Sequence, residues 1–234
     1  VREADGTISH YLAVKQDITE KRQAEAEITR LSYYDSLTGL ANRPLLMDRL
    51  GHALAALRRE DRQGALLMFD IDRFKNFNDA RGHELGDALL IALAERIKTL
   101  LRDGDTLARL SGDEFAVLLH DITPHRETAG RRALSVAEKI HLALEKPFIL
   151  DDDEANITAS IGITLVPENE SDNPLDAFRR SDTALHRAKE AGGHQTAFFE
   201  TQMGDMAQQR FRIERELRQG LRADRLRLFL QPQV

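Results

Sequence analysis

Two acidic residues directly follow a short apolar segment. Asp70 and Asp72 come after the run 65–69, whose composition is typical of a central strand buried on both faces. Because side chains alternate along a strand, both carboxylates should lie on one face while Ile71 faces the core. Capping of the next helix would explain either acid alone. A bound cation explains the pair better, since unpaired carboxylates repel each other, and an oxygen-only site favours Mg²⁺.

A second acidic pair, Asp113 and Glu114, follows Ser111 and Gly112 at a tight turn between two apolar segments. Taken alone, these acids are explained by ordinary turn chemistry. Taken together with the first pair, they favour a metal site, because neighbouring central strands would bring Asp113 beside Asp70.

Composition excludes several classes of function. The 234 residues, 41% of them hydrophobic, fit one globular domain with appended segments. A net charge of -6 gives no basic field for a nucleic-acid polymer as partner. The lack of cysteine excludes disulfides, zinc–thiolate sites and thiol nucleophiles. No apolar run approaches the roughly 20 residues of a membrane span. We expect a cytoplasmic location, with any membrane anchor of the full-length protein outside this segment.

Hydrophobic periodicity predicts alternating strands and helices. Their order, β-α-α-β-β-α-β with an inserted hairpin, predicts an α+β fold with an antiparallel central sheet and flanking helices to one side. The predicted strands are 65–69, 106–110, 115–120 and 195–199, with a hairpin around 151–154, and the predicted helices are 44–59, 73–80, 84–101, 126–144 and 175–190.

A charged N-terminal linker helix is predicted at 19–34, after the remnant of a β-hairpin in 1–18. Ala24, Ile28 and Leu31 fall at i, i+4 and i+7 and form one apolar stripe. A surface helix and a two-stranded coiled coil both fit so short a stripe.

Several spaced motifs resemble the GGDEF family of diguanylate cyclase domains. Residues 35–43 (DSLTGLANR) match the family's opening motif, and residues 69–87 match its nucleotide-binding stretch. Residues 111–115 (SGDEF) match the signature, with Ser111 in place of the first glycine. The resemblance implies that residues 35–201 form a GGDEF domain with the nucleotidyl cyclase, or palm-like, fold.

The flanking segments carry partial resemblances. Residues 1–18 resemble the end of a PAS sensor domain, which residues 19–34 would link to the central domain. Residues 202–234 comprise a second charged linker helix and the start of an EAL-like phosphodiesterase domain, carried by 226–234 (LRLFLQPQV). We therefore expect further domains on both sides.

The family resemblance implies a metal site. Asp70, the carbonyl of Ile71 and Asp113 would bind Mg²⁺, with Mn²⁺ as a substitute. Asp113 and Glu114 are the implied catalytic residues, and Asp113 would also activate the ribose 3′-OH.

The resemblance also implies a GTP site. Asn78 and Asp87 would bind guanine, and Phe74, Lys75 and Lys189 would contact the rest of the nucleotide. A carboxylate suits guanine because the N1–H and N2–H₂ groups are two parallel donors, whereas adenine has an acceptor at N1. Without the resemblance, Asp87 would be interpreted as an acid in the first turn of a helix and the two lysines as surface charges.

The implied reaction condenses two GTP molecules into cyclic di-GMP and releases two pyrophosphates. One domain presents one GTP, so the reaction needs a homodimer that forms through the GGDEF domains and the linker helix. The alternative is a catalytically weak GTP-binding module that controls a downstream EAL domain. The intact Asp113–Glu114 pair favours the enzyme. Ser111, and Gly193 in place of a phosphate-binding arginine, favour the alternative.

Arg102 and Asp105 form an Arg-x-x-Asp pattern shortly before the signature, which resembles the family's inhibitory product site. A helix end followed by a turn is the ordinary interpretation of these residues. Their offset from Ser111 matches the family's spacing, so we predict that cyclic di-GMP binds there and reduces activity.

Overall fold

The computed structural model describes residues 17, 19–151, 153–200, 209 and 213 of the chain. It divides into two units, residues 1–32 and 33–234, which are described separately. Almost all of the predicted 1–18 hairpin and of the predicted 202–234 flank lies outside the described residues.

The first unit contains the predicted linker helix, α1 (Thr19–Tyr33). Ile28 and Leu31 of the apolar stripe are exposed, at 64% and 54% of their full surface, and the side chain of Ala24 lies outside the description. An ion pair between Arg30 and Glu27 spans 2.7 Å on the same helix. Within the described part of the chain, no helix is long and apolar enough to cross a membrane.

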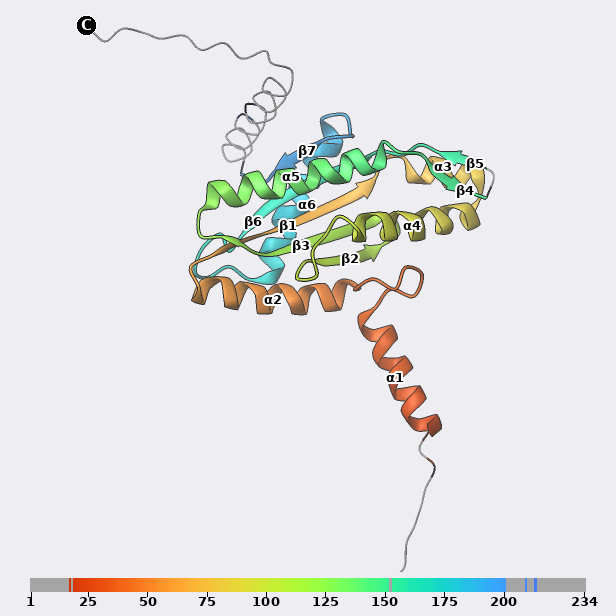
Figure 1. The fold of residues 1–234 in the computed structure, drawn as a ribbon, viewed down its shortest axis with the longest axis horizontal. Coiled ribbons are helices and arrows are strands. Elements are labelled where there is room, and N and C mark those ends of the chain that lie inside the picture. Colours follow the sequence, from red (N-terminus) through yellow and green to blue (C-terminus); the bar gives the residue numbers. More distant parts are fainter. Residues whose placement is uncertain (1–16, 18, 152, 201–208, 210–212, 214–234) are drawn as a thin grey trace, which may run out of the picture. The chain divides into compact units, whose positions relative to one another are not determined.

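The second unit is built on a five-stranded sheet with the strand order β2-β3-β1-β6-β7 (Figure 1). The strands are β1 (Gln63–Ile71), β2 (Thr106–Ser111), β3 (Glu114–Thr123), β6 (Ala159–Val166) and β7 (Thr196–Phe198). β1 lies at the centre, where it pairs antiparallel with both β3 and β6. The C-terminal ends of β1 and β2 and the start of β3 therefore meet at one edge of the sheet.

Two features of this sheet differ from the prediction. β7 pairs parallel to β6, so the sheet is mixed, because a helix crosses over between these two strands. β6 is also absent from the predicted elements, although all eight of its residues are buried. Its glycine, serine and threonine positions weaken the apolar run by which a buried strand is recognised.

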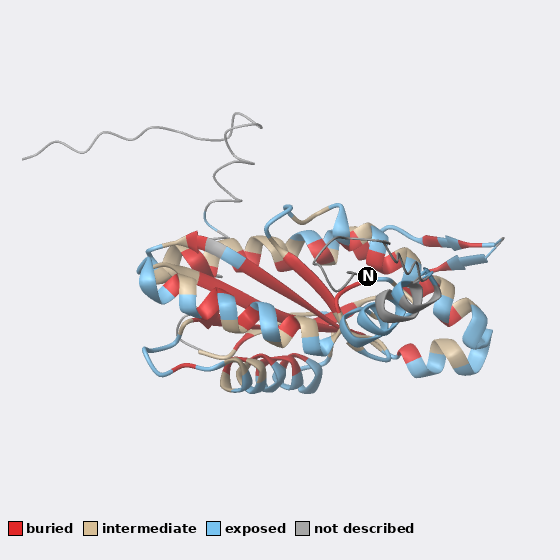
Figure 2. Ribbon diagram, turned by 90° about the horizontal axis from the view of Figure 1, so that it is seen from below, coloured by how far each residue is buried: buried red, intermediate tan, exposed pale blue. Residues whose placement is uncertain are grey.

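Helices cover both faces of the sheet, which corrects the prediction that they lie to one side (Figure 1). One face packs against α4 (His83–Lys98) and α5 (Arg126–Leu144), and the other packs against α2 (Arg43–Arg59) and α6 (Pro174–Glu190). The physical reason is that β1 is apolar at consecutive positions, so each face exposes apolar side chains that need cover. Figure 2 shows the buried positions concentrated on the strands and on the helix faces turned toward them.

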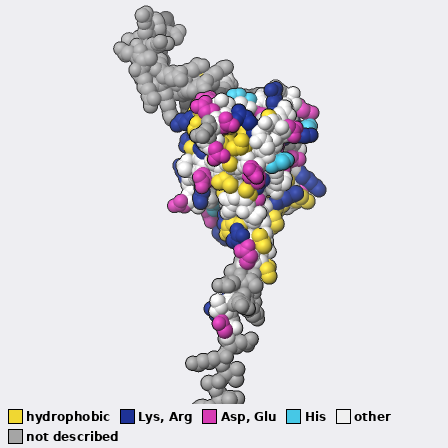
Figure 3. Space-filling model, turned by 90° about the vertical axis from the view of Figure 1, so that its right-hand side faces the viewer, with side chains coloured by type: hydrophobic (Ala, Val, Ile, Leu, Met, Phe, Trp, Pro, Cys, Tyr) yellow, Lys and Arg dark blue, Asp and Glu magenta, His cyan; other side chains and the backbone are white. Residues whose placement is uncertain are grey.

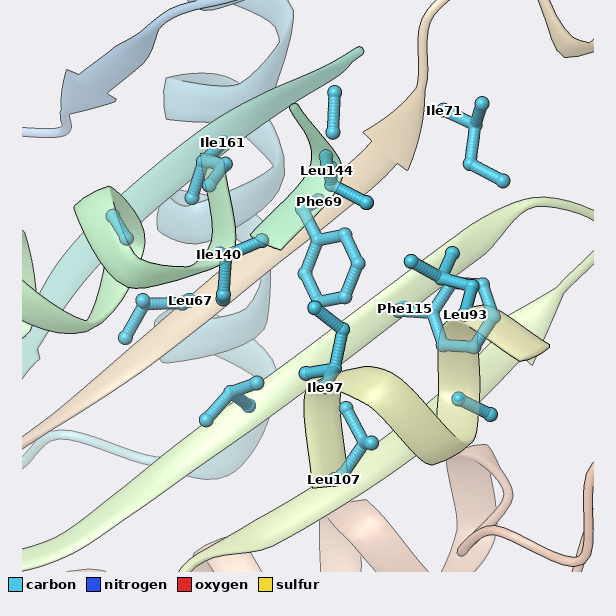
Figure 4. Close-up of a cluster of buried hydrophobic side chains, with 14 of the residues drawn as sticks. Leu67, Phe69, Ile71, Leu93, Ile97, Leu107, Phe115, Ile140, Leu144 and Ile161 are labelled. Atoms are coloured by element: carbon cyan, nitrogen blue, oxygen red, sulfur yellow. The ribbon is translucent and has the colours of Figure 1, made fainter. Parts of the chain in front are cut away.

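The larger core cluster lies under α4 and α5 (Figure 4). The rings of Phe69 on β1 and Phe115 on β3 stack there with centroids 5.4 Å apart. Ile97 from α4 and Ile140 from α5 are both fully buried in this cluster. Phe69 directly precedes Asp70, a predicted metal ligand, and Phe115 directly follows Glu114, a predicted catalytic acid, so this packing helps to position both acids.

The predicted hairpin around 151–154 forms a separate two-stranded sheet of β4 (Phe148–Leu150) and β5 (Asp153–Ala155). Just before this hairpin, Arg96 of α4 donates hydrogen bonds to the backbone carbonyls of Ala143 and Pro147, each at 3.0 Å. The short helix α3 (Phe74–Arg81) lies at the same end of the domain (Figure 1). Figure 3 faces this end, where acidic, basic and apolar side chains are interspersed.

Candidate functional site

A cleft of about 790 Å³ lies where β1 ends and α3 begins. Its lining includes most of the side chains that the sequence predicts for metal and nucleotide binding, namely Asp70, Ile71, Phe74, Lys75, Asp113 and Lys189. The cleft also contains residues to which the sequence assigned no role, among them Arg73, Asn156 and Thr158. Four separate stretches of the chain thus supply one site.

Strand pairing brings the two acidic pairs together. In the antiparallel register of β1 and β3, Asp70 lies opposite Glu114, and Asp113 precedes Glu114 in the turn. Asp113 lines the cleft beside Asp70, as expected for acids on neighbouring central strands. Glu114 is not among the lining residues and instead accepts a hydrogen bond from Ser111 Oγ at 3.0 Å.

The departure at Ser111 carries no backbone strain. In the turn it is Gly112 that has a positive φ, of 49°, whereas Ser111 is not among the residues with positive φ. A left-handed conformation would cost a non-glycine residue roughly 1–2 kcal/mol, and Ser111 avoids that cost. The replaced glycine of the signature is therefore compatible with the geometry of the turn.

Burial raises the pKa values of Asp70 and Asp113 in the cleft. Burial raises the pKa of Asp70 to about 6, while the hydrogen bond from Lys189 lowers it and the charges of Asp113 and Glu114 raise it. The pKa of Asp113 is also raised, chiefly by burial. A cation bound here would favour the ionised form of both carboxylates.

The donor set fits a metal that arrives with a nucleotide. Two carboxylates and the backbone carbonyl of Ile71 are oxygen ligands of the kind that Mg²⁺ prefers, and they leave positions for water and phosphate. Among the described residues, no group of three or more His, Cys, Asp or Glu side chains could hold a metal by itself. The site is therefore suited to a metal shared with a ligand rather than to a permanently bound structural metal.

Asp72 has a different role from the one that the sequence suggests. Its carboxylate accepts hydrogen bonds from Thr158 Oγ1 and Ser160 Oγ, both at 2.6 Å, and from the backbone N–H of His194 at 2.9 Å. Three donors compensate its charge without a cation. The argument that a shared cation must relieve the repulsion between Asp70 and Asp72 is therefore wrong for Asp72, which anchors the 192–194 loop to β6.

The same loop explains the departure at Gly193. Gly192, Gly193 and His194 have φ values of 117°, 75° and 52°. A Cβ on Gly193 would stand 3.1 Å from Asp72 Oδ1. Any other residue at position 193 would be strained by this φ and crowded by Asp72, so the glycine is required by the local backbone.

The start of α3 is suited to an anion. Arg73, the residue before the helix, is left-handed (φ 59°, ψ 28°), and the helix begins without a side-chain cap. The first N–H groups of a helix have no partner within it and attract negative charge. Arg73, Phe74 and Lys75 all line the cleft, so the helix start and a lysine face it together.

The predicted guanine residues lie beside this cleft rather than in its lining. Asn78 is on α3 and Asp87 is on α4, and Asp87 is exposed. Asn78 Oδ1 is buried and has no hydrogen-bond partner among the described residues. Gly86 makes room for it, since a Cβ at that position would stand 1.9 Å from Asn78 Oδ1. A buried acceptor without a donor is costly, and a ligand that donates would remove the cost.

Arg102 and Asp105 lie in the turn between α4 and β2, outside the main cleft. The Arg102 N–H donates to Asp105 Oδ2 at 3.2 Å, and the Asp105 N–H donates to the Arg102 carbonyl at 2.9 Å, which is ordinary turn geometry. Both residues also line a separate pocket of about 220 Å³, to which α5 contributes Arg132 and Lys139.

Arg109 makes contacts that the sequence interpretation missed. Its guanidinium contacts Asp35 Oδ1 at 3.0 Å and the Gly112 carbonyl at 2.9 Å, so it links the 35–43 motif to the signature turn. Burial alone would raise the pKa of Asp35, but hydrogen bonds from Thr38 and Arg109 outweigh it and lower the pKa. The sequence did contain a signal for this contact. An acid opens the 35–43 motif, and an arginine stands just before the turn at 111–114, so the two could have been expected to pair.

Comparison with known proteins agrees with this geometry. The family model described as "Diguanylate cyclase, GGDEF domain" matches residues 32–195. The chain belongs to the GGDEF family. The structure of an N-terminally truncated TpbB (YfiN) from Pseudomonas aeruginosa, which comprises only the GGDEF domain, superposes on this chain with a TM-score of 0.67 and 37% identity, covering 75% of this chain and 99% of that one. The predicted palm-like α+β fold is thus confirmed.

Two longer relatives contain a region similar to this chain and are named for different activities. The bifunctional diguanylate cyclase/cyclic di-GMP phosphodiesterase MucR of P. aeruginosa is 41% identical over 216 residues, which are 92% of this chain and 30% of MucR. The cyclic di-GMP phosphodiesterase NbdA of the same organism is 34% identical over 231 residues, which are 99% of this chain and 29% of NbdA. The chain therefore spans about a third of the length of these curated relatives.

Proposed function

We propose that residues 35–201 form a diguanylate cyclase domain, which condenses two GTP molecules into cyclic di-GMP and releases two pyrophosphates. The observation that best supports this proposal is that Asp70 and Asp113 line one cleft together with Lys75 and Lys189. Acids that hold a divalent cation, next to cations that hold phosphate, are the combination that nucleotidyl transfer requires. The similarity to MucR, which is named as a cyclase, supports this proposal.

Asp70, the carbonyl of Ile71 and Asp113 would hold Mg²⁺, or Mn²⁺ in its place. A divalent cation there would stabilise the negative charge that develops on the attacking and leaving oxygens. The fit rests on the raised pKa of both buried acids, which a cation would lower again.

The chain's own residues would carry the proton transfer and hold the phosphates. Asp113 accepts the proton of the ribose 3′-OH while that oxygen bonds to the α-phosphorus of the second GTP and the bond to pyrophosphate breaks. Glu114, opposite Asp70 in the sheet, is the second catalytic acid. Lys75, Lys189 and the start of α3 hold the triphosphate.

Guanine would bind beside Phe74 at the junction of α3 and α4. Asn78 Oδ1, which is buried without a partner, accepts from guanine, and the exposed Asp87 accepts from N1–H and N2–H₂. Adenine lacks this pair of donors, so ATP would leave Asn78 unpartnered and bind more weakly. A titration that gives equal affinity for GTP and ATP would exclude this assignment.

A homodimer follows from the reaction itself, because each domain binds one GTP and the two 3′-OH groups must attack each other's α-phosphorus. The exposed Ile28 and Leu31 of α1 support a role for the linker helix in this pairing. Activity per domain should therefore fall when the protein is diluted below its dimer dissociation constant, and constant activity would contradict the dimeric mechanism.

Product feedback would act through Arg102 and Asp105. Arg102 offers a planar fork to a phosphate or a guanine edge, and the nearby Arg132 and Lys139 make the pocket suited to a dianionic dinucleotide. Bound cyclic di-GMP would hold two domains with their GTP sites apart.

The alternative is a catalytically weak GTP-binding module that controls a phosphodiesterase domain elsewhere in the full-length protein. Gly193 favours it, because the missing arginine would remove a phosphate contact worth roughly 1.5–3 kcal/mol, and so does the similarity to NbdA. Ser111 no longer favours it, since that residue is unstrained.

Incubation of the purified protein with GTP and Mg²⁺, followed by chromatography of the nucleotides, separates the two functions. Cyclic di-GMP and pyrophosphate formed in a molar ratio of 1:2 would support the cyclase. Tight GTP binding without product would support the regulatory module. Asp113→Asn is the control for product made by a contaminating enzyme.

A further inference from the structure

The side chain of Lys189 forms the closest charged contact of Asp70. Lys189 Nζ lies 2.6 Å from Asp70 Oδ2, and the two residues come from the end of α6 and the end of β1. The Asp70 side chain is 11% exposed, so this carboxylate has little access to water. A charge-assisted hydrogen bond of this length to a buried carboxylate is a strong one.

An ammonium group in this position occupies Asp70 Oδ2 and competes with a metal ion for the same carboxylate. A divalent cation bound to Asp70 would need one of its carboxylate oxygens at about 2.0–2.1 Å, and two cations on one carboxylate oxygen repel each other strongly. Lys189 also offsets part of the charge of Asp113, which lines the same cleft. The cleft therefore contains a cationic side chain at its acidic centre.

Lys189 is nevertheless able to move. Its side chain is 40% exposed, and it reaches Asp70 through a flexible four-carbon stem at the edge of the cleft. The triphosphate of a nucleotide in this cleft would offer the ammonium several anionic oxygens at once. The same side chain can thus satisfy either Asp70 or a phosphate.

We propose that Lys189 is a tethered competitor of the metal: its ammonium occupies the cation position at Asp70 until a triphosphate draws it away. This inference rests on the proposed function, because the metal at Asp70 is the one that accompanies GTP. It adds that metal and nucleotide bind together. The triphosphate draws Lys189 away from Asp70, and the metal then takes the place of the ammonium there. A cleft built in this way resists loading with a divalent cation alone.

The test is a titration with Mn²⁺ alone, in which free Mn²⁺ is measured by electron paramagnetic resonance. Lys189→Met should bind Mn²⁺ about tenfold more tightly than the wild type, because the competing ammonium is gone. The same variant should bind GTP more weakly, because a phosphate contact is lost. Opposite effects of one substitution on the two ligands distinguish competition from general damage to the cleft.

Lys75→Met is the matched control. Lys75 lines the same cleft, and no ion pair with Asp70 is recorded for it among the described residues. Its replacement should weaken GTP binding without a comparable gain in Mn²⁺ affinity. Lys189→Arg, which keeps the charge, should keep the weak Mn²⁺ binding of the wild type. If Lys189→Met does not fold by circular dichroism, Lys189→Gln serves in its place.

Two results overturn the inference alone: unchanged Mn²⁺ affinity in the Lys189 variant, or an equal gain in Lys75→Met, which would indicate only a change in net charge. A different result overturns the proposed function itself. If GTP does not increase Mn²⁺ binding by the wild-type protein, the cleft is not a site for a metal–nucleotide complex, whatever the Lys189 variant does.

Discussion

Replacement of Gly86 by alanine would put a methyl group against the guanine side of the proposed GTP site. The new Cβ would stand 1.9 Å from Asn78 Oδ1, 3.0 Å from Asn78 Cγ and 3.3 Å from Phe74 Cζ. The first distance is far below van der Waals contact, so Asn78 must rotate away. The atoms in conflict lie at the end of a side chain that can turn, and the backbone need not move.

The expected loss is therefore in binding rather than in stability. A glycine-to-alanine change inside a helix gains up to about 1 kcal/mol in folding free energy, which offsets the cost of turning one asparagine. Loss of one neutral hydrogen bond to guanine costs about 0.5–1.5 kcal/mol, which corresponds to roughly two- to tenfold weaker GTP binding. Discrimination against ATP should fall by a similar factor.

Calorimetric titration with GTP and ATP, together with thermal unfolding, measures both quantities. Gly51→Ala is the matched control, because it is also a glycine inside a helix, and its Cβ would meet only Pro174 Cγ at an ordinary 3.6 Å. It should gain stability without any change in GTP affinity. A Gly86→Ala protein that is folded and binds GTP as tightly as the wild type would refute the assignment of Asn78 to guanine.

Four further predictions follow from single residues. Asp113→Asn should lower the rate of product formation at least about a hundredfold with an unchanged melting temperature, because an amide cannot accept the 3′ proton. Turnover at the wild-type rate would show that Asp113 is not the base. Arg102→Ala should weaken cyclic di-GMP binding roughly ten- to hundredfold in a titration with excess GTP, and unchanged affinity would make this segment only a turn. Gly162→Ala should lower the free energy of unfolding, measured in urea, by about 3 kcal/mol or more, because the new Cβ would lie 2.1 Å from the Leu185 backbone nitrogen. A loss below about 1 kcal/mol would contradict the packing of α6 on β6. Burial and the hydrogen bond with Glu168 raise the pKa of Glu200 to about 7, so the stability from its neutral form is lost as the pH rises through 7. Glu200→Gln also loses the ion pair with Arg126, so the expected result is a trend: relative to the wild type, the variant should gain about 1–3 kcal/mol between pH 5 and pH 8, and melting curves that show the opposite trend would exclude this shift.

The order of most helices and strands, and the proximity of the acids, followed from the sequence by itself. The apolar run 65–69 and the turn at 111–114 are local patterns, and local patterns specify which residues can form a buried strand and a tight turn. Once the two strands are neighbours, the acids at their ends must lie close together, so the shared cleft of Asp70 and Asp113 was expected without knowledge of the rest of the chain. The motifs that resemble the GGDEF family were likewise present in the sequence as short local stretches.

Other features depend on contacts between distant segments, which no local pattern encodes. The hydroxyl groups of Thr158 and Ser160 reach Asp72 only because β6 pairs with β1, and that pairing assigns Asp72 to a loop anchor instead of a metal site. The parallel β7 and the second helical layer have the same origin, since strand order and the covering of each face are properties of the assembled sheet.

Tertiary structure also decided what the two unusual residues mean. Whether Ser111 is strained depends on the φ that the β2–β3 pairing imposes, and the positive φ falls on Gly112 instead. Gly193 is required because the folded loop brings Asp72 against it. The 2.6 Å contact of Lys189 with Asp70 joins residues that are 119 positions apart. Residue types and spacing determined which groups are available for chemistry, and long-range packing decided which of those groups already have a partner.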